Sequence, residues 1–81
     1  MALNLKIVSP ERIVYDGDAE SVTVPGTLGA FEILKDHAPI ISSLEKGMLE
    51  YVCPEGRQQL AILGGFVEVV KNKVNICVEV E

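Results

Sequence analysis

Residues 73–81 read KVNICVEVE, and this stretch decides the fold class. Every second position in it carries an apolar, β-branched side chain: Val74, Ile76, Val78 and Val80. Because successive side chains of an extended chain point to opposite faces, this alternation predicts a strand with one buried and one solvated face. β-Branched residues also favour strand over helix. We therefore expect these residues to form a half-buried β-strand.

The same period of two recurs upstream in shorter runs, at residues 3–7, 21–24, 31–33 and 49–53. Residues that favour turns divide these runs at short intervals. The turn signals are Ser9-Pro10, Asp16-Gly17-Asp18, residues 25–29, residues 35–39, Lys46-Gly47, residues 54–56 and Lys71-Asn72-Lys73. The pattern predicts an all-β fold, a small β-sandwich or flattened barrel of about nine to ten short, mostly antiparallel strands.

Two consecutive glycines, Gly64 and Gly65, interrupt the apolar stretch from residue 60 to residue 70. Glycine inside a strand pattern marks a bulge, a tight bend or a close backbone approach. We interpret the pair as a bend or a hairpin between two strands.

The composition predicts one globular domain over residues 1–81. The net charge of −5 argues against a nucleic-acid partner, whose phosphates require a clustered positive surface. No apolar run approaches the ~20 residues that span a bilayer, and the first residues lack the features of a signal peptide. Mean hydropathy is +0.30, which is high for a small domain, so we expect apolar surface that a partner covers.

Metal-binding residues are few and scattered. One histidine, His37, and two distant cysteines, Cys53 and Cys77, do not match the ligand spacing of zinc sites. We expect the two thiols to be reduced, with a cross-strand disulfide or a metal site as alternatives. Residues 16–20 resemble the start of a calcium-binding EF-hand loop. The sixth and twelfth positions of that loop, which require glycine and glutamate, are Ser21 and Thr27 here, so an acidic turn is favoured.

Catalytic motifs are also missing. Asp36, His37 and Ser42 or Ser43 supply the residue types of a catalytic triad, but no G-x-S-x-G elbow accompanies them. The glycine-rich segments, residues 26–29 and 64–65, match neither of the phosphate-binding motifs G-x-x-x-x-G-K-[ST] and G-x-G-x-x-G. We therefore expect no catalytic, cofactor or metal site, and no small-molecule substrate.

Residues 71–73, Lys-Asn-Lys, admit a function of a different class. Lipoyl and biotinyl carrier domains are acidic all-β modules of similar size that present a lysine at a hairpin tip. The Asp-Lys and Met-Lys-Met signatures of those families are absent here. A solubilising turn is favoured, while a carrier domain and a β-sandwich adaptor of unknown partner remain alternatives.

Several segments together resemble the epsilon subunit of F-type ATP synthases, which is called delta in mitochondria. They are VSPER (8–12), YDG (15–17), AESVTVP (19–25), PGTLGAFEILKDHAP (25–39), GGFVEV (64–69) and NKV (72–74), in the family's order and spacing. The resemblance covers essentially the whole chain. It implies a β-sandwich in a non-catalytic subunit of the central stalk, the rotor, which clamps the gamma subunit to the c-ring. The subunit thereby couples proton-driven rotation to ATP synthesis.

The resemblance also implies two sets of contact residues. The c-ring interface maps onto Gly26, Thr27, Leu28, Ala30, Phe31 and His37. The gamma interface maps onto Ser9 and Ser42. Alternation puts Phe31 on one face with Ile33, so Phe31 belongs either to the interface or to the core.

Three departures from the family pattern stand out. Ala30 occupies a position where many members carry an acidic residue, so apolar contacts by Leu28 and Phe31 are expected instead. Lys35-Asp36 replaces a Pro-Gly pair before His37. The two C-terminal helices of the family, which inhibit ATP hydrolysis, do not follow residue 81, so we expect coupling without self-inhibition. The expected location is peripheral, on the cytoplasmic face of the inner (plasma) membrane.

Overall fold

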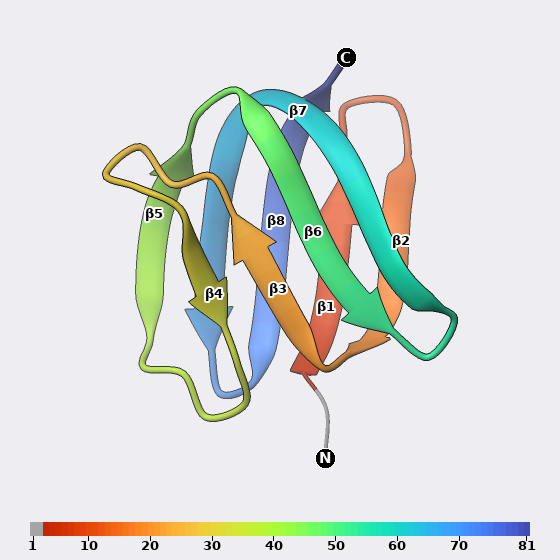
Figure 1. The fold of residues 1–81 in the computed structure, drawn as a ribbon, viewed down its shortest axis with the longest axis vertical. Coiled ribbons are helices and arrows are strands. Elements are labelled where there is room, and N and C mark those ends of the chain that lie inside the picture. The colour runs from red at the N-terminus through yellow and green to blue at the C-terminus, as the bar shows by residue number, and fades with distance from the viewer. Residues whose placement is uncertain (1–2) are drawn as a thin grey trace.

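Eight β-strands and no helix make up residues 3–81, the part of the chain that the computed structural model describes (Figure 1). The strands are β1 (Leu3–Val8), β2 (Ile13–Ala19), β3 (Ser21–Val24), β4 (Phe31–Ile33), β5 (Ile40–Leu44), β6 (Gly47–Cys53), β7 (Gly56–Val70) and β8 (Lys73–Val80). The predicted all-β class is confirmed. No helix long and apolar enough to cross a membrane occurs in this part of the chain.

The strands form two packed layers that share β7. The first half of β7 pairs with β6, which pairs with β3, which pairs with β4. The second half of β7 lies between β5 and β8, and the sheet continues through β1 to β2. Figure 1 shows β7 arching from one layer to the other. All of these pairs are antiparallel except β1 with β8, so the expectation of mostly antiparallel strands is confirmed.

The alternation read from residues 73–81 is the one that the structure shows. Val74, Ile76 and Val78 are buried, while Asn75 and Glu79 are exposed. β1, β3 and β6 bury alternating side chains in the same way. Every buried residue among those described is apolar or, in the case of Tyr51, aromatic with a hydroxyl. The largest fully buried side chains are Leu3, Leu5, Ile7, Ile33, Leu49, Ile62 and Ile76.

The predicted turn at Asp16-Gly17-Asp18 is wrong, because these residues lie inside β2. Asp16, Gly17 and Asp18 pair with Lys6, Leu5 and Asn4 of β1. β2 is an edge strand, which tolerates glycine and charged residues because one of its sides faces solvent. The side chain of Tyr15 lies over Gly17, where an added Cβ would be 3.0 Å from the Tyr15 hydroxyl, and that hydroxyl donates a hydrogen bond to Asp18 O at 2.6 Å.

Gly64 and Gly65 lie within β7 and do not form a hairpin. The pairing of β7 with β8 shifts register between Ile62 and Gly64, and Gly65 has φ +152°. Such an irregularity bends a strand without ending it. The chain therefore crosses from one layer to the other as one strand, which is the main reason that eight strands are found where nine to ten were expected.

Candidate binding surfaces

The loop after β3 is fastened along the edge of β5. Thr27 N donates to Ser43 O at 3.1 Å, and the hydroxyls of Thr27 and Ser43 lie 2.9 Å apart. Gly26 forms an isolated bridge with Leu44, and Glu45 N donates to Pro25 O at 2.9 Å. These bonds hold residues 25–27 in place while the following residues extend into solvent. Leu28 is fully exposed, with a relative accessibility of 104%.

Gly26 lets this loop fold back over an aromatic ring. A Cβ at Gly26 would lie 2.8 Å from Gly29 O and 2.9 Å from Cε1 of Phe31, which leaves no room for a side chain. Phe31 is half-buried and packs against the core, and Ala30 beside it is exposed. Phe31 therefore supports the loop from below, and only part of its ring is open to a partner.

The loop between β4 and β5 brings His37 to the same surface. The rings of Phe31 and His37 have centroids 6.4 Å apart. His37 N donates to Leu34 O at 3.1 Å, and Nδ1 lies 2.7 Å from Ala38 O, so this ring nitrogen carries a proton. Of the residues that the family resemblance puts at one interface, the structure brings Phe31 and His37 together. Gly26 and Thr27 contact Leu44 and Ser43 at the end of β5, whereas His37 precedes the start of β5, so the two groups lie on the same β4–β5 edge but at its opposite ends (Figure 1).

Ser9 lies at the mouth of an apolar groove on the outer face of the layer that contains β1 and β8. Its backbone N and its Oγ both donate to Arg12 O, at 2.9 and 3.2 Å. The groove has a volume of about 380 Å³, and its lining includes Val8, Ser9, Gly64, Phe66, Cys77 and Glu79. Phe66 is 48% exposed at its wall. A surface of this shape and character is suited to an apolar side chain of a partner.

Ser42 is not part of this groove. It lies in β5, pairs with Val67 and is half-buried, and its Oγ donates to Ser43 O at 3.2 Å. β7 and β8 lie between β5 and β1, so the structure separates Ser42 from Ser9 by two strands. The two residues expected at one interface are therefore not neighbours.

Sequence reasoning missed the groove and its largest side chain, Phe66. The signal was present in the alternation, because Val67 and Val69 are buried and Phe66 has the opposite parity. Phe66 pairs with Cys77 of β8, and Cys77 pairs with Val8 of β1, so the three side chains form one row across the outer face. An aromatic residue at a solvated position of a strand is the feature that indicates such a surface.

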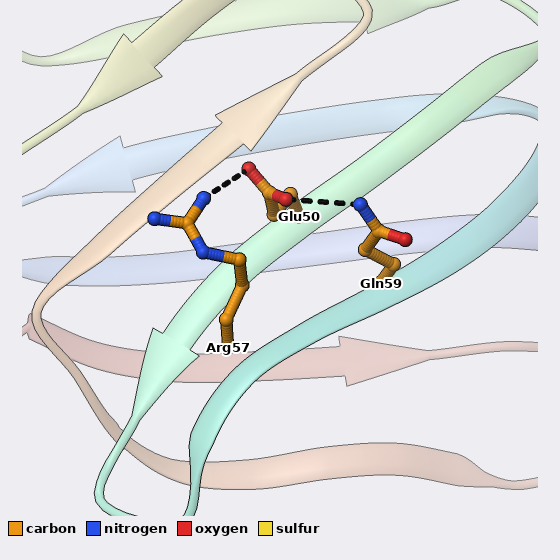
Figure 2. Close-up of polar contacts among 3 residues, drawn as sticks. All are labelled: Glu50, Arg57 and Gln59. Atoms are coloured by element: carbon orange, nitrogen blue, oxygen red, sulfur yellow. Dashed lines mark hydrogen bonds and ion pairs between the residues drawn. The ribbon is translucent and has the colours of Figure 1, made fainter.

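The outer face of the other layer is polar. Glu50 of β6 accepts hydrogen bonds from Arg57 Nη1 at 2.9 Å and from Gln59 Nε2 at 3.0 Å, as Figure 2 shows. Thr23 of β3 and Gln59 of β7 pair with Glu50 on either side. The apolar groove therefore distinguishes one face of the sandwich from the other.

Tyr15 and Tyr51 close one side of the sandwich. Their ring centroids are 4.9 Å apart. The pKa of Tyr15 is raised to about 12, mainly because the hydroxyl is buried and to a smaller extent because Cys53 and Glu55 lie nearby. Burial is also the main reason that the pKa of Tyr51 is raised. Both hydroxyls are therefore protonated at neutral pH, and this pair is a packing contact.

The remaining candidate groups are also accounted for. Cys53 and Cys77 are free thiols, as expected. Lys71 and Asn72 form the β7–β8 turn that the sequence predicted. Among residues 3–81, no group of three or more histidine, cysteine, aspartate or glutamate side chains is arranged to hold a metal ion.

The sequence matches a known family over almost its full length. The family described as ATP synthase, Delta/Epsilon chain, beta-sandwich domain matches residues 2–80. The chain belongs to this family. An ATP synthase epsilon chain of Leptospira borgpetersenii is 43% identical over 74 residues, which are 91% of this chain and 58% of that protein. One of Gloeothece citriformis is 38% identical over 78 residues, 96% of this chain and 56% of that protein. The chain thus spans little more than half the length of these curated relatives.

Two solved structures share the fold of this delta/epsilon-type domain. A chain of the Euglena gracilis mitochondrial ATP synthase, solved with OSCP, F1 and c-ring, superposes with a TM-score of 0.88 at 22% identity, covering 95% of this chain and 50% of that one. A chain of the Tetrahymena thermophila mitochondrial ATP synthase central stalk and c-ring superposes with a TM-score of 0.83 at 16% identity, covering 98% and 64%. These similarities confirm the sandwich fold.

Proposed function

We propose that this domain is a non-catalytic part of the central stalk of an F-type ATP synthase. In this role it clamps the gamma subunit to the c-ring and couples proton-driven rotation to ATP synthesis. It lies peripherally, on the cytoplasmic face of the inner (plasma) membrane. The observation that carries the proposal is the family match over residues 2–80.

The geometry supports two binding surfaces on one stiff body. The groove beside Ser9 is apolar and faces outward, which suits a permanent interface, since such interfaces are larger and more apolar than transient ones. We assign it to the gamma subunit, with Phe66 as its main contact. Ser42 lies on β5, next to β7, but it pairs with the buried Val67 and does not line the groove, so we do not include it among the main contacts.

The β4–β5 edge is the proposed c-ring surface. Gly26 and Thr27 anchor the β3–β4 loop to β5. The outer surface of the β4–β5 edge is formed by Leu28, Ala30, Phe31 and His37. Leu28 is the main contact that we propose, because a fully exposed leucine side chain gains the most binding free energy when a partner covers it. No metal, cofactor or small molecule takes part in this proposal.

Binding to purified partners tests the proposal, with one exposed apolar residue changed on each surface. We expect Phe66→Asp to weaken binding to the gamma subunit by more than about 30-fold, the scale of an interface hot spot. Leu28→Asp should weaken binding to the c-ring by a similar factor and leave gamma binding unchanged. The matched control is Met48→Asp, which changes a side chain of exposure similar to that of Phe66, 51% against 48%, on the outer face of the other layer.

Circular dichroism establishes that each variant is folded before binding is measured. All three positions are exposed, so we expect stability changes below about 1 kcal/mol. An unaltered chain that binds neither gamma subunit nor c-ring would refute the proposed function. Equal losses for Met48→Asp and Phe66→Asp would refute the assignment of the groove.

A further inference from the structure

The loop that carries His37 is tied to the β7–β8 turn by two side-chain hydrogen bonds. Asp36 N donates to Asn72 Oδ1 at 2.7 Å, and Asn72 Nδ2 donates to Asp36 Oδ1 at 3.2 Å. The two residues are 36 positions apart in the sequence, and their segments lie side by side at one end of the sandwich in Figure 1. This reciprocal pair joins the proposed c-ring surface to the rigid hairpin behind it.

Asn72 is itself held firmly. Lys71 and Asn72 have φ values of 50° and 63°, the conformation of a two-residue hairpin turn that matches strand twist. Val70 and Lys73 pair on either side of this turn, and Asn72 O accepts a hydrogen bond from Asn4 N at 2.8 Å. The Asn72 side chain therefore projects from a fixed backbone.

Asp36 also adopts a left-handed conformation, with φ 65°. Asparagine and aspartate are the non-glycine residues that tolerate this region best. A glycine at position 36 would adopt the same backbone conformation, but it would offer no oxygen to Asn72 Nδ2. The Lys35-Asp36 pair thus keeps the turn and adds a contact that a Pro-Gly pair cannot make.

We propose that Asn72 is a positioning residue, which holds residues 34–39 so that His37 is presented beside Phe31 to the c-ring. Asn72 acts through Asp36 and does not itself touch the ring. The inference rests on the proposed function, since it concerns how one of the two proposed surfaces is kept in shape. It predicts that loss of the pair affects ring binding and leaves gamma binding unchanged.

Asn72→Gly is the direct test, because glycine adopts φ 63° without strain while both side-chain bonds are lost. We expect ring affinity to fall about fivefold, the effect of losing one to two solvent-exposed hydrogen bonds. Affinity for the gamma subunit should not change. In amide exchange followed by NMR, the Asp36 amide should exchange faster, while amides of β7 and β8 keep their rates.

Exchanging the two partners provides the rescue. Asn72→Asp places two carboxylates opposite each other and should also weaken ring binding. Adding Asp36→Asn to Asn72→Asp restores a donor facing an acceptor and should recover the affinity. Asp36→Asn alone is the matched control, since an amide oxygen at position 36 still accepts from Asn72 Nδ2.

The outcomes separate the two proposals. The positioning role alone is overturned if Asn72→Gly changes neither the affinity for the c-ring nor the exchange rate of the Asp36 amide. It is also overturned if the double variant does not recover the affinity for the c-ring. Parallel losses of ring and gamma affinity also overturn it, because they indicate a general loss of structure. An unaltered chain that does not bind the c-ring overturns the proposed function, and the positioning role with it.

Discussion

Gly65 lies where a side chain has no room. A Cβ there would collide with the Cys77 carbonyl oxygen and come within 2.9 Å of Val78 Cα, and its φ of +152° is rare for other residues. We expect Gly65→Ala to lower the free energy of unfolding by at least about 2 kcal/mol, from overpacking and backbone strain together. Urea denaturation measures this change.

Gly64→Ala is the control at the neighbouring position. The nearest atom to a Cβ at Gly64 is Leu44 O at 3.5 Å, an ordinary contact. We expect a change below about 1 kcal/mol for this variant. If the two variants were equally unstable, the close approach of β7 and β8 at Gly65 would not be the cause.

Individual site residues show what a single sequence can predict. The resemblance placed Phe31 and His37 in one interface, and the structure brings their rings together. Alternation alone left Phe31 open between core and interface, because a half-buried ring that packs beneath a loop belongs partly to both. Ser42 and Ser9 are on different parts of the sheet because two strands intervene, and this separation depends on strand order, which no local pattern encodes.

Strand β8 allows a direct test of the element from which the fold was predicted. Ile76 is fully buried and its neighbour Asn75 is exposed. We expect Ile76→Ala to lower the free energy of unfolding by about 2–5 kcal/mol, because it removes buried methyl groups and leaves a cavity. Asn75→Ala should change it by no more than about 0.5 kcal/mol. Urea denaturation of both variants measures the difference, and similar values would contradict the assigned faces of β8.

The alternation predicted β8, β1, β3, β4 and β6 well, since each has one side on the core. It failed for β2, where an edge strand accepts Asp16, Gly17 and Asp18, residues that usually indicate a turn. It also failed to predict that β7 continues through Gly64 and Gly65. There the chain bends between layers, and the need for a close approach to β8 selects glycine. Both failures arise from strand neighbours that are distant in the sequence.

The whole molecule joins its two proposed surfaces through continuous backbone pairing. Phe66 at the groove pairs with Ser43 of β5, and the Ser43 hydroxyl contacts that of Thr27 in the proposed c-ring loop. The groove and the loop are therefore separated by one strand pair and one side-chain contact. A force applied at one surface reaches the other through hydrogen-bonded strands and a close-packed core, which deforms little.

This arrangement should make unfolding a single cooperative event. β1 pairs with β8 from the other end of the chain, and both layers share β7, so the two layers cannot separate without breaking strand pairs of β7. We expect urea transitions followed by far-ultraviolet circular dichroism and by the fluorescence of Tyr15 and Tyr51 to coincide. Refolding should take milliseconds to seconds, as for other all-β domains with distant pairings. If the tyrosine signal were lost first, the contact between β2 and β6 would open independently, and the sandwich would contain a flexible seam that a rotor coupling could not tolerate.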